Sequence, residues 1–126
     1  MLRKALVILG GMLNIAWGVA HVIPTSSVVN GFGNLSNDNK NIIIMEWVTE
    51  GMALMFIGVL VVLVALVARK KNTTRKTVYL VSALMMFSMA VLSLFTGFNI
   101  DFLPYKLCPL IFSISGVLIF QGAFGK

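Results

Sequence analysis

The sequence is poor in the side chains on which most enzyme chemistry depends. Its 126 residues include one cysteine, one histidine and four acidic residues. Cys108 alone cannot form a disulfide within the chain, and dithiol exchange needs a second cysteine close to it. Motifs for nucleotide binding, zinc-dependent proteolysis and serine hydrolysis are also absent from the sequence. The chain therefore gives no support to a conventional catalytic site.

Charged residues are also scarce, at 11% of the chain, whereas 59% of the residues are hydrophobic and the mean hydropathy is +0.97. Soluble domains carry about 25% charged residues. Most of the apolar residues lie in four segments, 2–23, 42–68, 77–98 and 103–124, and each is close to the ~20 residues that cross a bilayer as a helix. We therefore expect an all-α integral membrane protein, with residues 1–126 forming a single up-down-up-down bundle of four transmembrane helices. The connection between the second and third segments is short, so we expect these two helices to be antiparallel neighbours.

The basic residues indicate how this bundle is oriented. They gather at the start of the first segment, between the second and third segments, and at the last residue: Arg3, Lys4, Arg69, Lys70, Lys71, Arg75, Lys76 and Lys126. With an even number of spans all of them lie on one side, which the positive-inside rule assigns to the cytoplasm. We expect cytoplasmic termini in a plasma (inner) membrane. The net charge of +6 then reflects membrane topology rather than nucleic-acid binding.

The opposite, outer side receives the one long polar connection. Residues 25–41 are rich in Ser, Asn and Gly, a composition typical of turns and loops. A short helical turn is expected within this loop at residues 26–29.

All four acids and the histidine fall on this outer side. Glu46 and Glu50 are one helical turn apart at the start of the second span, where like charges repel by a few tenths of a kcal/mol in water. Glu46 is expected to be solvated, and Trp47 is expected to be an aromatic anchor at the membrane interface. Glu50 lies deeper, and an ionisable side chain near membrane depth is a functional candidate. His21, at the outer end of the first helix, reaches Glu50 if these helices are neighbours, which gives a proton or cation site near physiological pH.

Asn14 is the polar residue near the middle of the first span. A buried amide without hydrogen bonds is costly, so we expect Asn14 to bond to a neighbouring helix. The alternative is that it lines a pathway. Metal binding stays undecided, because one histidine with two carboxylates is a weak ligand set.

In size and four-helix layout the chain resembles small multidrug-resistance transporters and DoxX-type membrane proteins, a likeness of architecture that carries no shared motif. The small multidrug-resistance transporters have a membrane-embedded Glu in their first helix that couples protons to cationic substrates. At mid-helix this chain has Asn14, which cannot titrate.

Three functions remain. The favoured one is a small accessory or interaction protein without catalysis of its own, in contact with the bilayer and with a second copy or another membrane protein. The second is an oligomeric transporter or proton- or cation-coupled channel in which His21 and Glu50 handle the ion and Asn14 lines the path. The third is a redox accessory protein that holds a quinone or haem between its helices, although the residues identify no cofactor.

Overall fold

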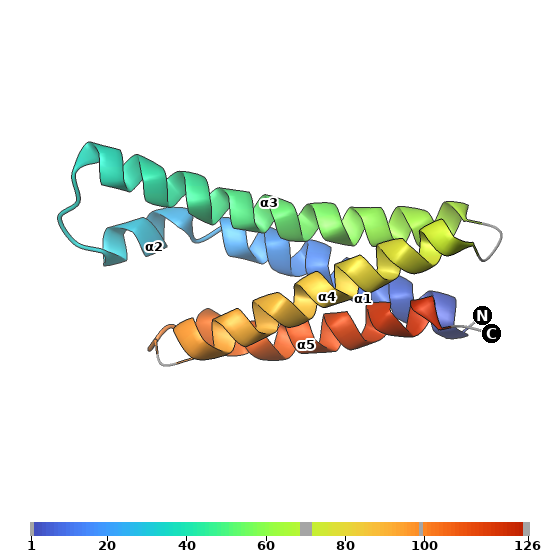
Figure 1. Cartoon of the computed structure of the whole chain (residues 1–126). Coiled ribbons are helices and arrows are strands. Elements are labelled where there is room, and N and C mark those ends of the chain that lie inside the picture. The colour runs from blue at the N-terminus through green and yellow to red at the C-terminus, as the bar shows by residue number, and fades with distance from the viewer. Residues whose placement is uncertain (1, 69–71, 99, 125–126) are drawn as a thin grey trace.

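The structure, a computed structural model, describes residues 2–68, 72–98 and 100–124 (Figure 1). These residues form five helices and no strand: α1 (Leu2–Val22), α2 (Thr25–Gly31), α3 (Asn37–Val67), α4 (Thr73–Thr96) and α5 (Leu103–Ala123). Helices α1, α3, α4 and α5 are each long and apolar enough to cross a membrane. The four predicted apolar helices are thereby confirmed, and α2 is the helical turn expected in the outer loop. The basic residues Arg69, Lys70, Lys71 and Lys126 lie outside the described residues.

Two helices begin before their apolar segments, because polar side chains cap them. Ser36 accepts a hydrogen bond from the backbone N–H of Asn39 at 3.2 Å, so α3 begins at Asn37 and not at residue 42. Asn72 accepts one from the N–H of Arg75 at 2.9 Å, which starts α4 at Thr73 rather than at residue 77. With 31 residues, α3 is about 46 Å long and extends past its neighbours toward α2 (Figure 1).

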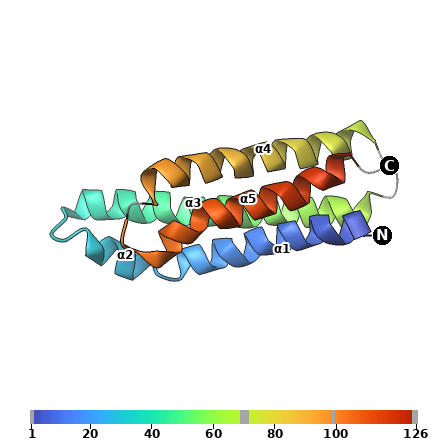
Figure 2. The same ribbon diagram turned by 90° about the horizontal axis from the view of Figure 1, so that it is seen from below.

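The long helices run in alternating directions, but helices that follow each other in sequence are not always packed together (Figures 1 and 2). Helix α1 packs against both α3 and α5, and α4 packs against α5, whereas α3 and α4 contact each other only slightly. The short connection between α3 and α4 predicted that these two would be packed neighbours, and this prediction was wrong. Helix α1 lies between α3 and α5 because it has glycines on the two faces that contact them.

The glycines of α1 and α3 face each other in pairs. A Cβ added to Gly58 would lie 2.5 Å from the carbonyl oxygen of Gly11, and one added to Gly18 would lie 2.7 Å from that of Gly51. Both contacts are with backbone atoms, which cannot rotate away as a side chain can. The neighbouring Gly10 instead faces α5, where the Ser115 hydroxyl donates to its carbonyl oxygen at 3.0 Å. Small residues on two faces therefore place α1 between α3 and α5.

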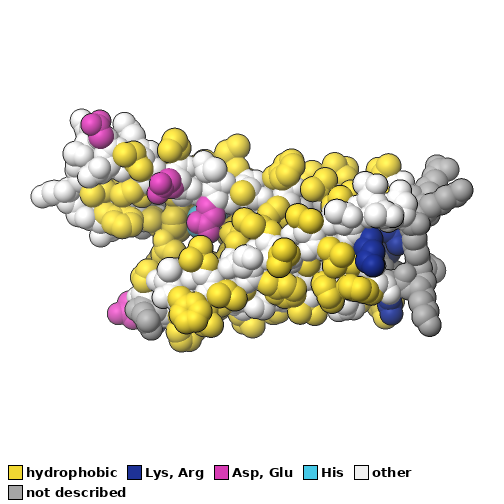
Figure 3. All heavy atoms as spheres, viewed as in Figure 1, with side chains coloured by type: hydrophobic (Ala, Val, Ile, Leu, Met, Phe, Trp, Pro, Cys, Tyr) yellow, Lys and Arg dark blue, Asp and Glu magenta, His cyan; other side chains and the backbone are white. Residues whose placement is uncertain are grey.

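The two ends of the molecule differ in charge. At one end Arg3 donates to the carbonyl oxygen of Phe124 at 2.7 Å, and Lys76 lies 5.2 Å from the centre of the Phe124 ring. We call this the basic end, and we call the opposite end, which carries Asp38, Glu46, Glu50 and Asp101, the acidic end. Figure 3 shows this separation on one face, with a broad hydrophobic surface between.

Candidate functional site

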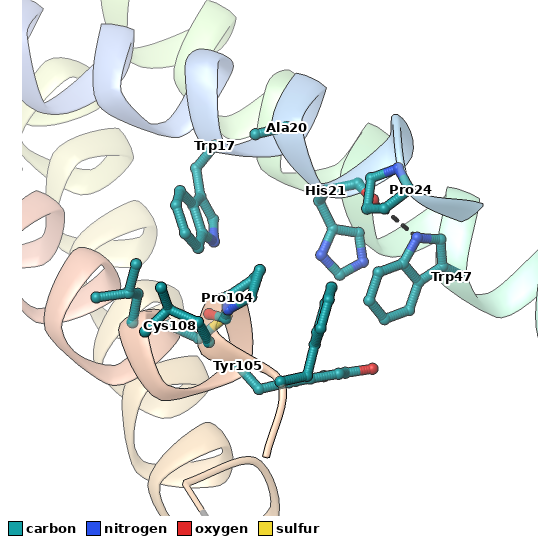
Figure 4. Close-up of a pocket in the computed structure, with 11 residues that line it drawn as sticks. Trp17, Ala20, His21, Pro24, Trp47, Pro104, Tyr105 and Cys108 are labelled. Carbon is teal, nitrogen blue, oxygen red and sulfur yellow. Dashed lines mark hydrogen bonds between the residues drawn. The ribbon is translucent and has the colours of Figure 1, made fainter. Parts of the chain in front are cut away.

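Three helices meet at the acidic end around the only histidine of the chain. His21 lies in the last turn of α1, Trp47 lies on α3, and Tyr105 lies in the first turn of α5 (Figure 4). Glu50 also lies on α3. Residues 47 and 50 are three apart and therefore share one face of α3. The seam of paired glycines brings that face against α1, since Gly51 follows Glu50 directly and contacts Gly18 and Val22.

His21 and Glu50 lie next to each other. The imidazole Nε2 is 3.5 Å from a carboxylate oxygen of Glu50. Only 6% of the His21 side chain is exposed, compared with 44% of that of Glu50. Nε2 forms no hydrogen bond with any described residue. The contact between His21 and Glu50 is therefore electrostatic and is not a hydrogen bond. The pair predicted from sidedness is thus brought together, with its imidazole buried and its carboxylate half-exposed.

Trp47 holds the imidazole from the other side. The two rings stack with their centroids 3.9 Å apart and their planes 18° from parallel. The indole N–H of Trp47 donates to the backbone carbonyl of His21 at 2.8 Å, the bond that is dashed in Figure 4. Carbonyls in the last turn of a helix lack partners within the helix, so this bond also caps α1. Trp47 was expected at the membrane interface as an aromatic anchor, but only 9% of it is exposed.

A cavity of about 200 Å³ lies beside His21, between α1 and α5. We call it the α1–α5 cavity, and Figure 4 shows the side chains that line it: Trp17, Ala20, His21, Pro24, Trp47, Phe102, Leu103, Pro104, Tyr105, Leu107 and Cys108. The Cys108 thiol donates to the Pro104 carbonyl at 3.4 Å, which occupies its only proton. The wall is otherwise aromatic and aliphatic.

Two ring nitrogens at this site are buried and have no hydrogen-bond partner among the residues that the structure describes: Nε1 of Trp17 and Nε2 of His21. Cys108 sulfur lies near the indole of Trp17, but a thiol is a weak acceptor and the hydrogen-bond geometry is not met. Less than 1 Å² of the surface of either nitrogen is accessible, so neither atom can be reached by a molecule in the cavity.

A second cavity of about 130 Å³ lies on the Glu50 side of His21. The side chains of His21, Tyr105 and Cys108 line both cavities, so the imidazole lies between them. Hydroxyl groups from α4 add polar character to this second cavity, since Ser93 and Thr96 also line it. Their protons are used within α4, because Ser93 donates to Ala90 and Thr96 donates to Leu92.

The remaining predicted site residues lie elsewhere. Glu46 is exposed, as expected, and forms no ion pair with any residue in 2–68, 72–98 or 100–124. Asn14 is fully buried, and neither of its amide atoms bonds to a described residue, so the predicted bond to a neighbouring helix is not found. It lines neither cavity at the acidic end. Asp101, the remaining acid of this end apart from Asp38, pairs with Lys106 at 3.3 Å.

Metal and haem fit this site poorly. No group of three or more His, Cys, Asp or Glu that could hold a metal ion occurs in the described part of the chain. A drug-sized ligand needs roughly 300–1,000 Å³, and a haem is larger than most such ligands. The α1–α5 cavity, at about 200 Å³, therefore has no room for a haem but does have room for a single ring.

Comparison of the chain with protein-family models, with curated proteins and with solved structures found no match. The function is therefore argued from the site alone.

Proposed function

We propose that the protein is an integral membrane protein of accessory type that binds a small molecule at its acidic end without catalysing a reaction. Helices α1, α3, α4 and α5 cross the bilayer in this proposal as an up-down-up-down bundle. Large apolar side chains on their outer surfaces support it, because Phe56, Leu84 and Phe95 are each about two-thirds or more exposed. A lipid environment removes the cost of exposing so much apolar surface to water.

The charge separation supports one orientation in a plasma (inner) membrane. Arg3, Arg75 and Lys76 lie at the basic end. Further basic residues adjoin them in the sequence, so the positive-inside rule assigns that end to the cytoplasm. The acidic end then faces outward. Helix α4, which packs mainly on α5, leaves much of its surface to lipid, to a second copy or to another membrane protein.

The observation that carries the binding proposal is the α1–α5 cavity of about 200 Å³ with its aromatic and aliphatic wall. An apolar cavity of about 150 Å³ is enough to bind benzene. Helices α1 and α3 pack through backbone contacts beside this cavity, which keeps that side of the site in place without the ligand.

The test is a titration with p-xylene of the protein in lipid nanodiscs, followed through the carbon-13 methyl signals of Ala20, Leu103 and Leu107, which line the cavity. We expect saturable changes confined to methyl groups at the cavity. The control is Ala20→Phe, which fills the cavity from an exposed position of α1 and should abolish saturation. Changes that never saturate and are equal in both variants, as for p-xylene dissolved in lipid, would contradict the proposal.

A second candidate, proton- or cation-coupled transport, is favoured by the 3.5 Å approach of His21 to Glu50. A half-exposed carboxylate beside a buried imidazole is an arrangement that passes protons. In liposomes with an internal pH dye, this function requires proton flux that Glu50→Gln abolishes and Glu46→Gln preserves. No flux in the native protein, or equal flux in both variants, would rule it out.

A further inference from the structure

We infer that the second cavity binds a primary ammonium group, and that the Glu50 carboxylate and the hydroxyl oxygens of Ser93 and Thr96 accept hydrogen bonds from it. The group belongs either to a free small amine or to the headgroup of an aminophospholipid, which present the same chemistry. The inference does not rest on the α1–α5 cavity. It follows from the charge beside the second cavity, its hydroxyl groups, its size and its place in the membrane.

The second cavity has a negative side chain in its wall and no basic one to balance it. Among the described residues that line it, Glu50 is the one acid, and none is Lys or Arg. The Glu50 side chain is 44% exposed, and its charged partner among the described residues is the imidazole of His21 at 3.5 Å. An imidazole balances a carboxylate only while it is protonated. A bound cation is therefore the partner that the Glu50 carboxylate favours when His21 is neutral.

The hydroxyl groups of this cavity can accept hydrogen bonds but have no proton left to give. Ser93 donates its proton to the Ala90 carbonyl at 3.1 Å, and Thr96 donates its own to the Leu92 carbonyl at 2.8 Å. Each hydroxyl oxygen keeps its lone pairs as acceptors. Thr96 is exposed and Ser93 is half-buried, so a ligand in the cavity can reach them. An ammonium group has three N–H donors and no acceptor, which matches these oxygens.

The volume limits the ligand to an ammonium group on a short chain. The second cavity has about 130 Å³, slightly less than the roughly 150 Å³ that holds a benzene molecule. An ethyl- or propylammonium ion is smaller than benzene and fits. The rest of the wall suits such a chain, because Met89, Leu92 and Phe112 offer apolar contacts to its methylene groups.

The cavity lies at a depth where primary ammonium groups occur. Counted from the end of α3 at Val67, Glu50 lies about 26 Å along the helix, close to the outer boundary of a ~30 Å hydrocarbon core in the proposed orientation. Phosphatidylethanolamine headgroups lie at this boundary, and amines in the outer solution reach it. Helices α3 and α4 lie apart at the acidic end (Figure 1) and contact each other only slightly. A bound ammonium group would join Glu50 of α3 to Thr96 of α4.

The test is a titration with propylammonium chloride in nanodiscs of phosphatidylcholine, a lipid without a primary amine. It is followed through the carbon-13 methyl signals of Met89 and Leu92, which line the second cavity. We expect saturable shifts at these methyl groups and none at Ala20, which lines only the other cavity. Tetramethylammonium has the same charge but no N–H, and 1-propanol has the same chain but no charge. Neither should cause saturable shifts.

Three variants test the assigned oxygens. Glu50→Gln removes the charge and should weaken propylammonium binding by about 10-fold or more. Thr96→Val keeps the shape of the side chain but removes one acceptor, and should weaken binding about 3- to 10-fold. It also keeps the test valid if Glu50→Gln disturbs His21. Glu46→Gln is the matched control, because Glu46 is exposed one helical turn away and lines neither cavity, and it should bind as the native protein does.

Absence of saturable shifts in the native protein would contradict the inference. Equal binding of tetramethylammonium, or equal affinities in the three variants, would also contradict it, since the cation would then be held by charge alone or at another place. None of these results affects the p-xylene titration of the α1–α5 cavity, so the two proposals fail separately.

Replacing part of the phosphatidylcholine by phosphatidylethanolamine identifies the source of the ammonium group. If the lipid headgroup occupies the cavity, the Met89 and Leu92 signals move before propylammonium is added, and the affinity for propylammonium falls in the native protein. Unchanged signals and unchanged affinity assign the cavity to a free amine.

Discussion

Single residues at the acidic end show why the two tryptophans of the chain differ in importance. The N–H of Trp47 joins α3 to the last turn of α1, and its ring stacks on His21. The N–H of Trp17 donates to no described residue. Replacing Trp47 by Phe therefore removes a hydrogen bond. Replacing Trp17 by Phe removes a buried donor that has no described partner.

Trp47→Phe is predicted to lower the free energy of unfolding by about 1–2 kcal/mol, because it removes the N–H that the buried His21 carbonyl accepts. Trp17→Phe, the matched control, removes the same part of an indole but no hydrogen bond to a described residue, so it should lower the free energy of unfolding by about 1 kcal/mol less than Trp47→Phe does. The measurement is reversible unfolding in mixed micelles of increasing SDS content. Equal losses in the two variants would contradict the hydrogen-bond assignment.

The sequence predicts the His21–Glu50 pair but not the Trp47 ring that stacks on His21. Sidedness places both residues at one end of the molecule, and the structure brings them within 3.5 Å. Trp47 was interpreted as an interfacial aromatic, although it lies three residues before Glu50 and so shares its helix face. That spacing could have identified Trp47. The cavity could not be predicted, because it depends on how side chains of α1 and α5 fill the space between two helices far apart in sequence.

At the scale of helices, paired glycines determine which helices pack together. The contacts of Gly11 with Gly58 and of Gly18 with Gly51 involve backbone atoms on both sides. The sequence shows that Gly51 and Gly58 are seven residues apart, which places them on one face of a helix, but not which helix that face meets. The four long helices could be predicted because a long apolar segment can be recognised from the local sequence alone. Which helices pack together depends on how faces far apart in the sequence match, and for this reason the prediction that α3 and α4 are packed neighbours was wrong.

Gly58→Ala is predicted to destabilise the protein by about 1–3 kcal/mol, since the new Cβ would lie 2.5 Å from the carbonyl oxygen of Gly11 and 3.0 Å from the backbone nitrogen of Ile15. The helices must separate to admit it. Gly31→Ala is the control, because its added Cβ would meet no described atom within 4 Å, and it should leave stability unchanged or slightly higher. The same unfolding assay measures both. A Gly58→Ala protein as stable as the native one would show that α1 and α3 do not pack this closely.

At the scale of the whole molecule, the separation of charge between the two ends predicts its orientation in the membrane. The predicted topology uses the basic residues of the sequence, and Arg3, Arg75 and Lys76 are the members of that set with a described contact or cap at the basic end. The orientation itself is a property of the protein with its membrane and so needs an experiment on cells.

Single cysteines introduced into a Cys108→Ala background should label from opposite sides of the membrane. Asn34→Cys lies in the outer loop between α2 and α3, and Thr74→Cys lies in the exposed first turn of α4. We expect a membrane-impermeant maleimide to label Asn34→Cys on intact cells, and to label Thr74→Cys only after the membrane is permeabilised. The reverse pattern would place the acidic end in the cytoplasm.

The measurement that tests the account most directly is the nitrogen-15 spectrum of His21 as a function of pH, in nanodiscs, for the native protein, Glu50→Gln and Glu46→Gln. The chain has one histidine, so its ring nitrogens need no assignment. If the acidic end is built around His21 and Glu50 in contact, Glu50→Gln changes the pH dependence of the His21 signals, and Glu46→Gln leaves it as in the native protein. Three identical titration curves would contradict this arrangement of α1 and α3, and with it the site on which both proposals rest.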